Sequence, residues 1–367
     1  MAADTAASTP AAAPRRGNFR RAVEGVQVAA QQPAPESVSS MPAAGQYNGP
    51  APLHAAGQSV RHSLIDARTK EQAVVAQVGL RGFFNQFGMA LSPGKKEEAR
   101  LAVKHRIRAP KDDLQAIAIL MLKGGAGKTT VTATLGQVFS EVRSDGVVAV
   151  DANPSSPNEL PLRTATHEKN LSKEDMLESR DLSKRDFVQN YMSLTEHNLN
   201  VLANGWRPDA EQIFSEGDIE DIRRVVSQYY SLLLWDGGTD FFSPTVKEVL
   251  AQSDALVLLV EVSVLGANAA GAAIDWLRAK GMSKLLTRTI LVGNESSPTP
   301  PVTWEELKPI LAPQQIKMHH IPFDKHLHEG LAVDLKKLNK RTLEAVEDLA
   351  ALLADDFQIP QPAQMAS

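Results

Sequence analysis

The stretch Leu122-Lys123-Gly124-Gly125-Ala126-Gly127-Lys128-Thr129-Thr130 is the most informative part of this sequence, together with the segments on either side of it. The segment 116–122 before it is wholly apolar, which is typical of a buried parallel strand. The segment after it carries an apolar stripe at helical spacing, formed by Val131, Leu135, Val138, Phe139 and Val142. A strand, a glycine-rich turn and a helix in this order predict an anion-binding loop, because glycines allow a tight turn and the helix start carries partial positive charge.

The residue types in this loop predict a phosphate site that also holds a metal ion. Main-chain N–H groups would surround the phosphates, the Lys128 ammonium would reach the outer phosphates, and the Thr129 hydroxyl would ligate Mg²⁺. The predicted phosphate-binding residues are Gly124, Gly125, Ala126, Gly127, Lys128, Thr129 and Thr130.

The loop departs from the general phosphate-loop pattern near its start. Leu122 stands where that pattern has its first glycine, and Lys123 follows it. The order KGG-x-GKTT resembles the deviant phosphate loop of the MinD/ParA ATPases. In that family the early lysine crosses a dimer interface to the partner's nucleotide. The resemblance therefore implies ATP as the ligand, a homodimer formed on ATP binding, and catalytic roles for Lys123 and Lys128.

A second motif, Val147-Val148-Ala149-Val150-Asp151-Ala152-Asn153-Pro154, is an apolar strand that ends in a carboxylate and a turn. In open α/β sheets the carboxyl ends of the strands form the ligand crevice. The resembled family commonly has Asp-x-Asp-Pro here, with the first aspartate near Mg²⁺ and the second orienting the attacking water, which implies catalytic roles for Asp151 and Asn153. An amide can hold a water but cannot take its proton. Asn153 thus leaves two hypotheses open, a slow ATPase or a nucleotide-binding scaffold with little or no hydrolysis.

A third motif, Ser231–Gly238, runs from four apolar residues into Asp236 and two glycines. Asp236 resembles the Walker B carboxylate, which holds Mg²⁺ through water. Gly237 and Gly238 would let the backbone approach a γ-phosphate, as a switch requires. The predicted metal-binding residues are Thr129, Asp151 and Asp236.

Two later segments predict the base side of the nucleotide site. Asn294 ends the apolar run from Ile290, and in the resembled family an asparagine at this place reads the adenine edge, since an amide pairs with a donor and an acceptor together. Ile321-Pro322-Phe323-Asp324 matches the segment that flanks the base. Asn294, Pro322 and Asp324 are therefore predicted to bind the nucleotide.

Three stretches resemble a narrower group, the MinD-like ATPases associated with actinobacterial type VII (ESX) secretion loci: AVDANP at 149–154, AIDWL at 273–277 and IPFDKHLHEG at 321–330. The resemblance spans about residues 80–357. It implies an ATPase switch that positions or regulates a macromolecular assembly such as a type VII secretion system, with a secretion or partition component as protein partner.

Composition, periodicity and charge together predict four segments. Residues 1–111 carry 15 Lys and Arg against 7 Asp and Glu, whereas 112–367 carry 24 against 36. We predict a disordered Ala/Pro-rich tail over 1–60, a basic helical extension over 61–111, the ATPase domain over 112–357 and a flexible end over 358–367. The basic tail, including Arg15 to Arg21, is read either as a partner- or nucleic-acid-binding arm or as a solvated tail. In the extension, the apolar stripe Leu80–Phe87 predicts a helix that packs on the domain or docks a partner or membrane surface.

Within the domain, apolar runs and helical stripes alternate, which predicts an α/β fold with a mostly parallel sheet and helices on both faces. Ser243-Pro244 predicts the start of a helix through Leu250, and 340–357 predicts a final amphipathic helix. Strands are expected at 115–122, 147–151, 199–203, 231–236, 255–261, 288–293 and 317–321.

Other patterns limit the classes of function. The absence of cysteine excludes disulfides and thiolate metal sites. No segment resembles a signal peptide or a membrane span, which favours a soluble, cytoplasmic protein without stable membrane insertion. A histidine metal site is disfavoured, since His319, His320, His326 and His328 lack supporting ligands on a shared element. The cluster Lys336, Lys337, Lys340 and Arg341 is read either as a solvated helical face or as a surface for nonspecific DNA.

Overall fold

The computed structural model describes residues 94–109, 113–122, 125, 127–154, 158–164, 166, 173–206 and 213–357. The chain divides into two compact units, residues 29–102 and the remainder. Helix α4 (Lys95–Ile107) begins in the first unit and ends in the second, and all strands among the described residues belong to the second. The predicted tail over 1–60, the apolar stripe at 80–87 and the C-terminal segment 358–367 lie outside the described residues.

The second unit is built on an eight-stranded sheet with the strand order β3-β4-β2-β5-β1-β6-β7-β8. Neighbouring strands are parallel except for β3 and β4, which are antiparallel. This arrangement confirms the predicted mostly parallel α/β fold. The strands are β1 (Gln115–Leu120), β2 (Val147–Ala152), β3 (Ser193–Leu194), β4 (Asn200–Leu202), β5 (Leu232–Gly237), β6 (Ala255–Glu261), β7 (Thr289–Asn294) and β8 (Lys317–Ile321).

The central strands are continuous apolar runs because both of their faces are covered. Alternate residues of each strand enter different clusters: Ala116, Ala118 and Leu120 of β1 lie in one, and Ile117 and Ile119 lie in the other. The sheet therefore divides the core into two layers.

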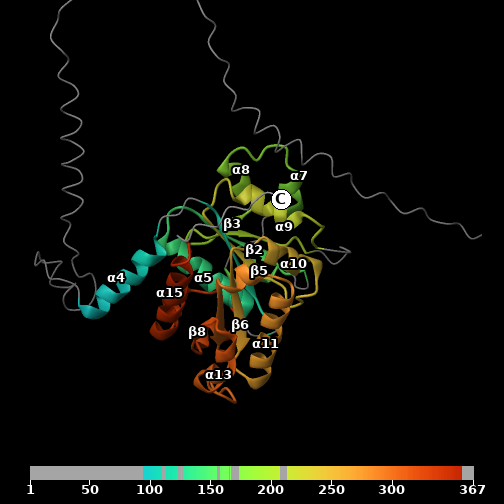
Figure 1. The fold of residues 1–367 in the computed structure, drawn as a ribbon. Helices are drawn as coiled ribbons and strands as arrows, with labels where there is room; N and C mark the ends of the chain where they lie inside the picture. Colours follow the sequence, from blue (N-terminus) through green and yellow to red (C-terminus); the bar gives the residue numbers. More distant parts are fainter. Residues whose placement is uncertain are drawn as a thin grey trace, which may run out of the picture. The chain divides into compact units, whose positions relative to one another are not determined.

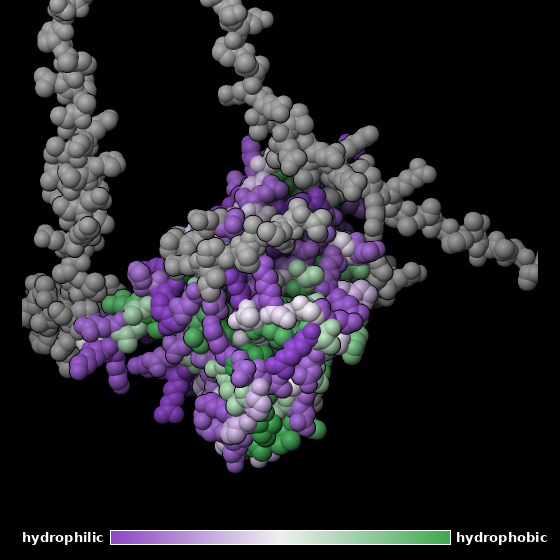
Figure 2. Space-filling model, viewed as in Figure 1, coloured by the Kyte–Doolittle hydropathy of each residue, from purple (hydrophilic) through white to green (hydrophobic). Residues whose placement is uncertain are grey.

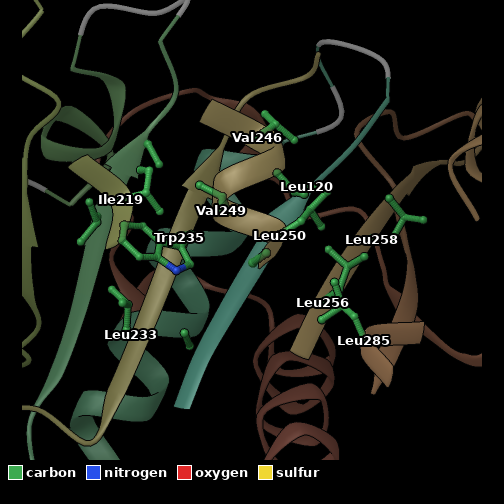
Figure 3. Packing of buried hydrophobic residues seen from close by; sticks show 14 of the residues in the cluster. Leu120, Ile219, Leu233, Trp235, Val246, Val249, Leu250, Leu256, Leu258 and Leu285 are labelled. Atoms are coloured by element: carbon green, nitrogen blue, oxygen red, sulfur yellow. The ribbon is translucent and has the colours of Figure 1, made fainter. Parts of the chain in front are cut away.

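Different helices cover the two faces of the sheet (Figure 1). The first cluster joins the sheet to α9 (Asp218–Val226), α10 (Pro244–Ala251), α11 (Val264–Ala279) and α13 (Trp304–Leu311). Figure 3 shows part of it, where Trp235 of β5 lies beside Val249 of α10 and Leu233 lies further along β5. The second cluster joins the sheet to α5 (Lys128–Val142) and α15 (Lys340–Ala354).

Short helices fill the connections between these elements. Two of them, α6 (Glu159–Arg163) and α14 (Lys325–His328), follow the carboxyl ends of β2 and β8 and border the candidate site. The others are α7 (Lys173–Glu178), α8 (Arg185–Gln189), α12 (Ser283–Leu286) and the 3₁₀ turns Ala312–Gln314 and Leu335–Lys337.

The end of α4 is anchored to the sheet-bearing unit. Ile107 is fully buried, and the Arg143 guanidinium donates hydrogen bonds to the Ile107 carbonyl at 2.7 Å and the Ala109 carbonyl at 3.1 Å. The Arg106 guanidinium donates to both carboxylate oxygens of Asp355, just after α15. The last turn of α4 is thus tied to α5 and α15.

The described surface is mostly polar in the view of Figure 2, where hydrophobic residues form only smaller groups between hydrophilic ones. Among the described helices, none combines the length and the apolar character needed to cross a bilayer.

Candidate functional site

The sheet brings the predicted motifs to one edge. Asp151 at the end of β2 pairs in register with Asp236 near the end of β5, and β5 pairs with β1, whose end leads into the glycine-rich loop. On the other side of β1, the register of β7 with β8 pairs Asn294 with Ile321. From β1 the chain continues to β2 on one side of it, and from β5 it crosses to β6 on the other side. The carboxyl end of β1 is therefore the topological switch point at which open α/β sheets bind ligands.

The start of α5 offers free main-chain donors. Gly127 is its N-cap with φ 82°, a left-handed conformation that glycine adopts without strain. The first helical hydrogen bond runs from the Val131 N–H to the Gly127 carbonyl at 2.9 Å, so the N–H groups of Lys128, Thr129 and Thr130 have no partner within the helix. These donors, with the helix dipole, suit an anion.

The remaining residues of the predicted loop are only partly described. Gly125 has φ 96°, again a conformation suited to glycine. Lys123, Gly124 and Ala126 lie outside the described residues.

A cavity of about 550 Å³ lies against the start of α5. Asp151, Asn153 and Asp236 do not line it, although the charge of Lys128 and the hydroxyl of Thr129 act on Asp236. Two further cavities of about 640 and 610 Å³ lie at the amino ends of the strands, away from these motifs. The predicted residues that line the first cavity are Gly125, Gly127, Lys128, Thr129, Thr130, Asn294, Pro322 and Asp324.

Two neighbouring carboxylates are buried beneath the loop. Asp151 and Asp236 are each 1% exposed. Burial raises the pKa of Asp236 to about 6, against the opposing effects of the Lys128 charge and the Thr129 and Thr132 hydroxyls. Burial, and then repulsion from Asp236, raises the pKa of Asp151 well above its usual value. Both carboxylates are thus held in a setting that disfavours their charged forms.

These residues fit a hard divalent cation. The Thr132 hydroxyl donates to Asp236 Oδ1 at 3.3 Å, whereas Asp236 Oδ2 is buried and receives no hydrogen bond from any described residue. A buried carboxylate oxygen without a donor is unfavourable unless a cation or water meets it. Oxygen ligands are those that Mg²⁺ prefers, and Mg²⁺ usually keeps several waters while taking one or two protein carboxylates.

Asn153 is held in the same cluster. Its N–H donates to Asp151 Oδ1 at 3.2 Å, and its carbonyl accepts from the Asn204 side-chain amide at 2.8 Å. Its side-chain oxygen lies 3.6 Å from the point where a Cβ on Gly238 would stand, so the amide faces the loop after β5. The predicted water-holding group therefore lies between the ends of β2 and β5.

Three residues of the candidate site were not predicted from the sequence. Asn204, fully buried, also donates to Asp151 Oδ1 at 3.4 Å, and its only sequence signal is its place after the strand Asn200–Leu202. Glu159 and Arg163 lie four residues apart on α6, and both line the cavity. The Thr129 hydroxyl donates to Glu159 Oε2 at 3.5 Å, and the Arg163 guanidinium donates to the Thr130 hydroxyl oxygen at 2.7 Å.

The predicted base-side residues differ in their surroundings. Asn294 lies against the glycine loop, since a Cβ on Gly127 would stand 2.9 Å from its side-chain nitrogen. Asp324 is 3% exposed and accepts from the N–H groups of His326, Leu327 and Asn339 at 2.9, 3.4 and 2.7 Å. The first two bonds cap α14, the third ties Asp324 to the start of α15, and together they favour a role for Asp324 in shaping the loop beside Pro322.

The histidines of this region have structural partners. The His319 ring lies 2.7 Å from the Ala345 carbonyl, and the Asp334 N–H donates to His326 at 2.9 Å. His320 lies 3.0 Å from a Glu295 oxygen, and His328 lies 2.9 Å from the Ser296 carbonyl. In the part of the chain that the structure describes, no group of three or more His, Asp or Glu has the arrangement of a metal site. The predicted magnesium site differs in combining two carboxylates with a hydroxyl.

The basic cluster near the start of α15 is balanced by acids. Lys336 lies 3.8 Å from Glu196, Lys337 lies 3.3 Å from Asp334, and Lys340 lies 3.7 Å from Glu344. These exposed pairs reduce the local positive charge.

Comparison with known proteins agrees with this geometry. Residues 117–329 match the family model described as CobQ/CobB/MinD/ParA nucleotide binding domain. Over 373 aligned residues the chain is 32% identical to the ESX-1 secretion-associated protein EspI of Mycobacterium tuberculosis, covering 95% of this chain and 55% of that protein. The chain thus spans about half the length of the curated relatives that it matches.

The solved structures show the same fold at low sequence identity. A ParA family ATPase of Chlorobium tepidum has a TM-score of 0.53 at 17% identity, covering 64% of this chain and 98% of that one. MinD of Pyrococcus furiosus has a TM-score of 0.51 at 19% identity, covering 66% and 98%. The septum site-determining protein MinD of Pyrococcus horikoshii, complexed with Mg-ADP, has a TM-score of 0.50 at 20% identity, covering 65% and 94%. The family model and the identity to EspI confirm the resemblance predicted from the loop and from the secretion-linked stretches, and the solved structures agree in fold.

Proposed function

The chain belongs to the CobQ/CobB/MinD/ParA nucleotide-binding domain family, and from this we propose that it is a Mg-ATP-binding ATPase switch of the MinD/ParA type. In this proposal residues 112–357 form the ATPase domain, ATP closes two copies into a homodimer, and slow hydrolysis opens it again. The protein would act in the cytoplasm.

The observation that carries the proposal is the meeting of complementary charges at one edge of the sheet. Free N–H groups at the start of α5 and the Lys128 ammonium favour a polyphosphate, and the buried Asp151 and Asp236 lie beside them. Bound Mg²⁺ would supply charge neutralisation between the carboxylates and the phosphates. Thr129 stands in the first turn of α5 and lies near Asp236, where it opposes the rise in the pKa of that carboxyl.

A direct binding experiment tests the proposal. Titration calorimetry with ADP, with and without Mg²⁺, should give a saturable one-site isotherm that tightens with the metal, and Lys128→Ala should lose most of the affinity. If the full-length protein showed no heat with ADP or ATP at millimolar concentration, the proposed function would be wrong.

Hydrolysis is proposed to be slow because of Asn153. Its amide can hold a water by hydrogen bonding but cannot take the proton that the water must lose. The second candidate function is therefore a nucleotide-binding scaffold. A single-turnover assay with Mg-ATP separates the two: phosphate release above the Lys128→Ala background supports the ATPase, and none with partners present supports the scaffold.

The likeness to EspI suggests where the switch would act. EspI is described as ESX-1 secretion-associated. We propose by analogy that this chain positions or regulates a macromolecular assembly such as a type VII secretion system, through a protein partner that recognises one nucleotide state. A switch of this kind needs only a few kcal/mol of difference in affinity between its states. Pull-down of secretion components from cells should differ between ADP and a non-hydrolysable ATP analogue.

ParA-like binding of nonspecific DNA is the remaining alternative. The acids beside Lys336, Lys337 and Lys340 weaken the positive surface that it needs. The alternative predicts ATP-dependent binding whose salt slope falls when Lys340 and Arg341 are neutralised. A flat salt response would exclude it.

A further inference from the structure

Arg163 is a buried cation that joins three elements around the cavity. It ends α6, and its guanidinium donates to the Thr130 hydroxyl oxygen on α5 at 2.7 Å. The same group donates to the Leu327 carbonyl at 3.1 Å, on α14, and to the Leu331 carbonyl just beyond it. Its side chain therefore links the phosphate end of the cavity to the loop on the base side.

The charge of Arg163 is not neutralised by a paired acid. The residue is 8% exposed, and no described carboxylate lies within ion-pair distance of its guanidinium. Burial lowers its pKa, and only the more distant Glu159 opposes this. A buried charge without a counter-ion is unfavourable. An anion in the adjoining cavity would reduce that penalty.

The contact with Thr130 also fixes the direction of a proton. A guanidinium has donors but no acceptor, so in the 2.7 Å contact the Thr130 oxygen must accept. The Thr130 hydroxyl proton is then left to point elsewhere, and no described residue accepts it. Thr130 lines the cavity and lies in the first turn of α5, next to the free N–H groups.

We propose that Arg163 is a positioning residue that commits the Thr130 hydroxyl as a hydrogen-bond donor to a phosphate of the bound nucleotide. The inference rests on the proposed nucleotide-binding function and adds a residue to its site. Arg163 acts through Thr130, because its guanidinium occupies the acceptor side of that hydroxyl. A hydrogen bond polarised by a charged neighbour is stronger than a neutral one.

The test is a double-mutant cycle on the full-length protein, with ADP affinity measured by calorimetry. Thr130→Val and Arg163→Met should each weaken ADP binding about tenfold, which is about 1.4 kcal/mol. Because the two groups act as one unit, the double variant should also bind about tenfold more weakly than the wild type, and not about a hundredfold. Adenosine has no phosphate, so its dissociation constant should differ by less than twofold between the variants and the wild type. This constant is obtained by competition with a fluorescent ADP, corrected for the affinity of that probe for each protein.

Two variants control for effects on the fold. Thr130→Ser keeps the hydroxyl, so it should restore most of the affinity lost in Thr130→Val and should again respond to Arg163→Met. Arg278→Met removes a guanidinium that likewise donates to a carbonyl, that of Gln314 at 2.9 Å, but does not line the cavity. It should leave ADP affinity unchanged. Urea unfolding of each variant identifies any that fails to fold.

The outcomes separate this inference from the proposed function. Wild-type protein that does not bind ADP overturns both. Wild-type protein that binds ADP, with additive losses in the double variant, equal losses for adenosine, or no loss in a folded Thr130→Val, overturns the role of Arg163 alone. The Thr130 variants keep the test decisive even if Arg163→Met fails to fold.

Discussion

At the scale of single residues, the carboxyl of Asp236 gives the site a defined pH response. Its pKa is about 6 in the folded protein against 3.8 as the reference value. Between these values the folded state keeps a proton that the unfolded chain releases, so the free energy of unfolding falls as pH rises. The pKa difference corresponds to about 3 kcal/mol at 1.36 kcal/mol per unit. The folded protein is least stable when both Asp151 and Asp236 are charged. A bound cation would offset that charge, so the pair suits a metal site.

We therefore predict that Asp236→Asn stabilises the metal-free protein increasingly as pH rises from about 4 to 7. The amide cannot ionise, so the variant escapes the penalty of up to about 3 kcal/mol that the wild type carries at pH 7. Urea unfolding in EDTA at several pH values measures the difference between the two proteins. Parallel stability curves for variant and wild type would contradict the assignment.

Gly127 is the second residue with a specific requirement. Its φ of 82° and the Asn294 nitrogen 2.9 Å from a would-be Cβ both oppose a side chain. Gly127→Ala should lower the free energy of unfolding by about 1–3 kcal/mol and weaken ADP binding, because the first turn of α5 must shift.

The matched control is Gly271→Ala within α11, where the atom nearest to an added Cβ is 3.9 Å away. Helix propensity predicts a gain of up to about 1 kcal/mol there, seen as a higher denaturation midpoint.

Some site residues can be recognised from the sequence immediately around them, and others only from their contacts in the fold. Lys128, Asp151, Asp236 and Asn294 each follow or end an apolar strand, so sequence order alone indicates the edge on which they lie. Glu159, Arg163 and Asn204 could not be predicted, because their roles depend on contacts across the fold that no local pattern encodes. Asp324 has a local signal, but only the structure shows that its carboxylate caps α14.

At the scale of elements, long apolar runs were predictable and short elements were not. Seven of the eight strands were expected within about two residues of their ends, and Ser243 caps α10 as predicted, accepting from the Val246 N–H. β3 was missed because Ser193–Leu194 is too short to show alternation. The first strand ends at Leu120 rather than at 122, since the chain turns into the glycine loop, and α15 ends at Ala354 rather than 357. The five- and six-residue helices carry no stripe long enough to identify.

The junction of α4, α5 and α15 depends on Arg143. Its buried guanidinium donates to the Ile107 and Ala109 carbonyls, pairs with Asp145 and lies 5.7 Å from the ring centre of Phe357. Arg143→Met should lower the free energy of unfolding by about 2–4 kcal/mol, because buried carbonyls lose their donor. Hydrogen exchange should speed up at amides 106–109 before the sheet is affected.

An exposed ion pair provides the comparison for Arg143. Lys317 lies 2.9 Å from Asp356, with its side chain 47% exposed. Lys317→Met should change stability by less than about 1 kcal/mol, since exposed pairs are screened by water. Equal effects of the two substitutions would mean that Arg143 does not organise the junction.

At the scale of the whole molecule, the nucleotide-binding edge also carries exposed apolar side chains. Leu162 is 70% exposed on α6, Phe242 is 67% exposed after β5, and Leu265 is 68% exposed at the start of α11 after β6. All three follow the carboxyl ends of strands that meet at the predicted phosphate site. Large exposed hydrophobic residues on one edge are favoured where another surface covers them. This distribution agrees with the proposed closure of two copies across the nucleotide.

The final prediction concerns that closure. Size-exclusion chromatography with light scattering should give one mass with ADP and about twice that mass with a non-hydrolysable ATP analogue, because only the triphosphate would reach Lys123 of a second copy. Leu265→Asp should bind the analogue normally yet stay at the smaller mass, since a charge on the covered face opposes desolvation. Lys123→Ala should bind ADP like the wild type and also fail to double its mass. A wild type whose mass is the same with both nucleotides, despite measured binding of each, would leave the switch without its dimer and favour the scaffold.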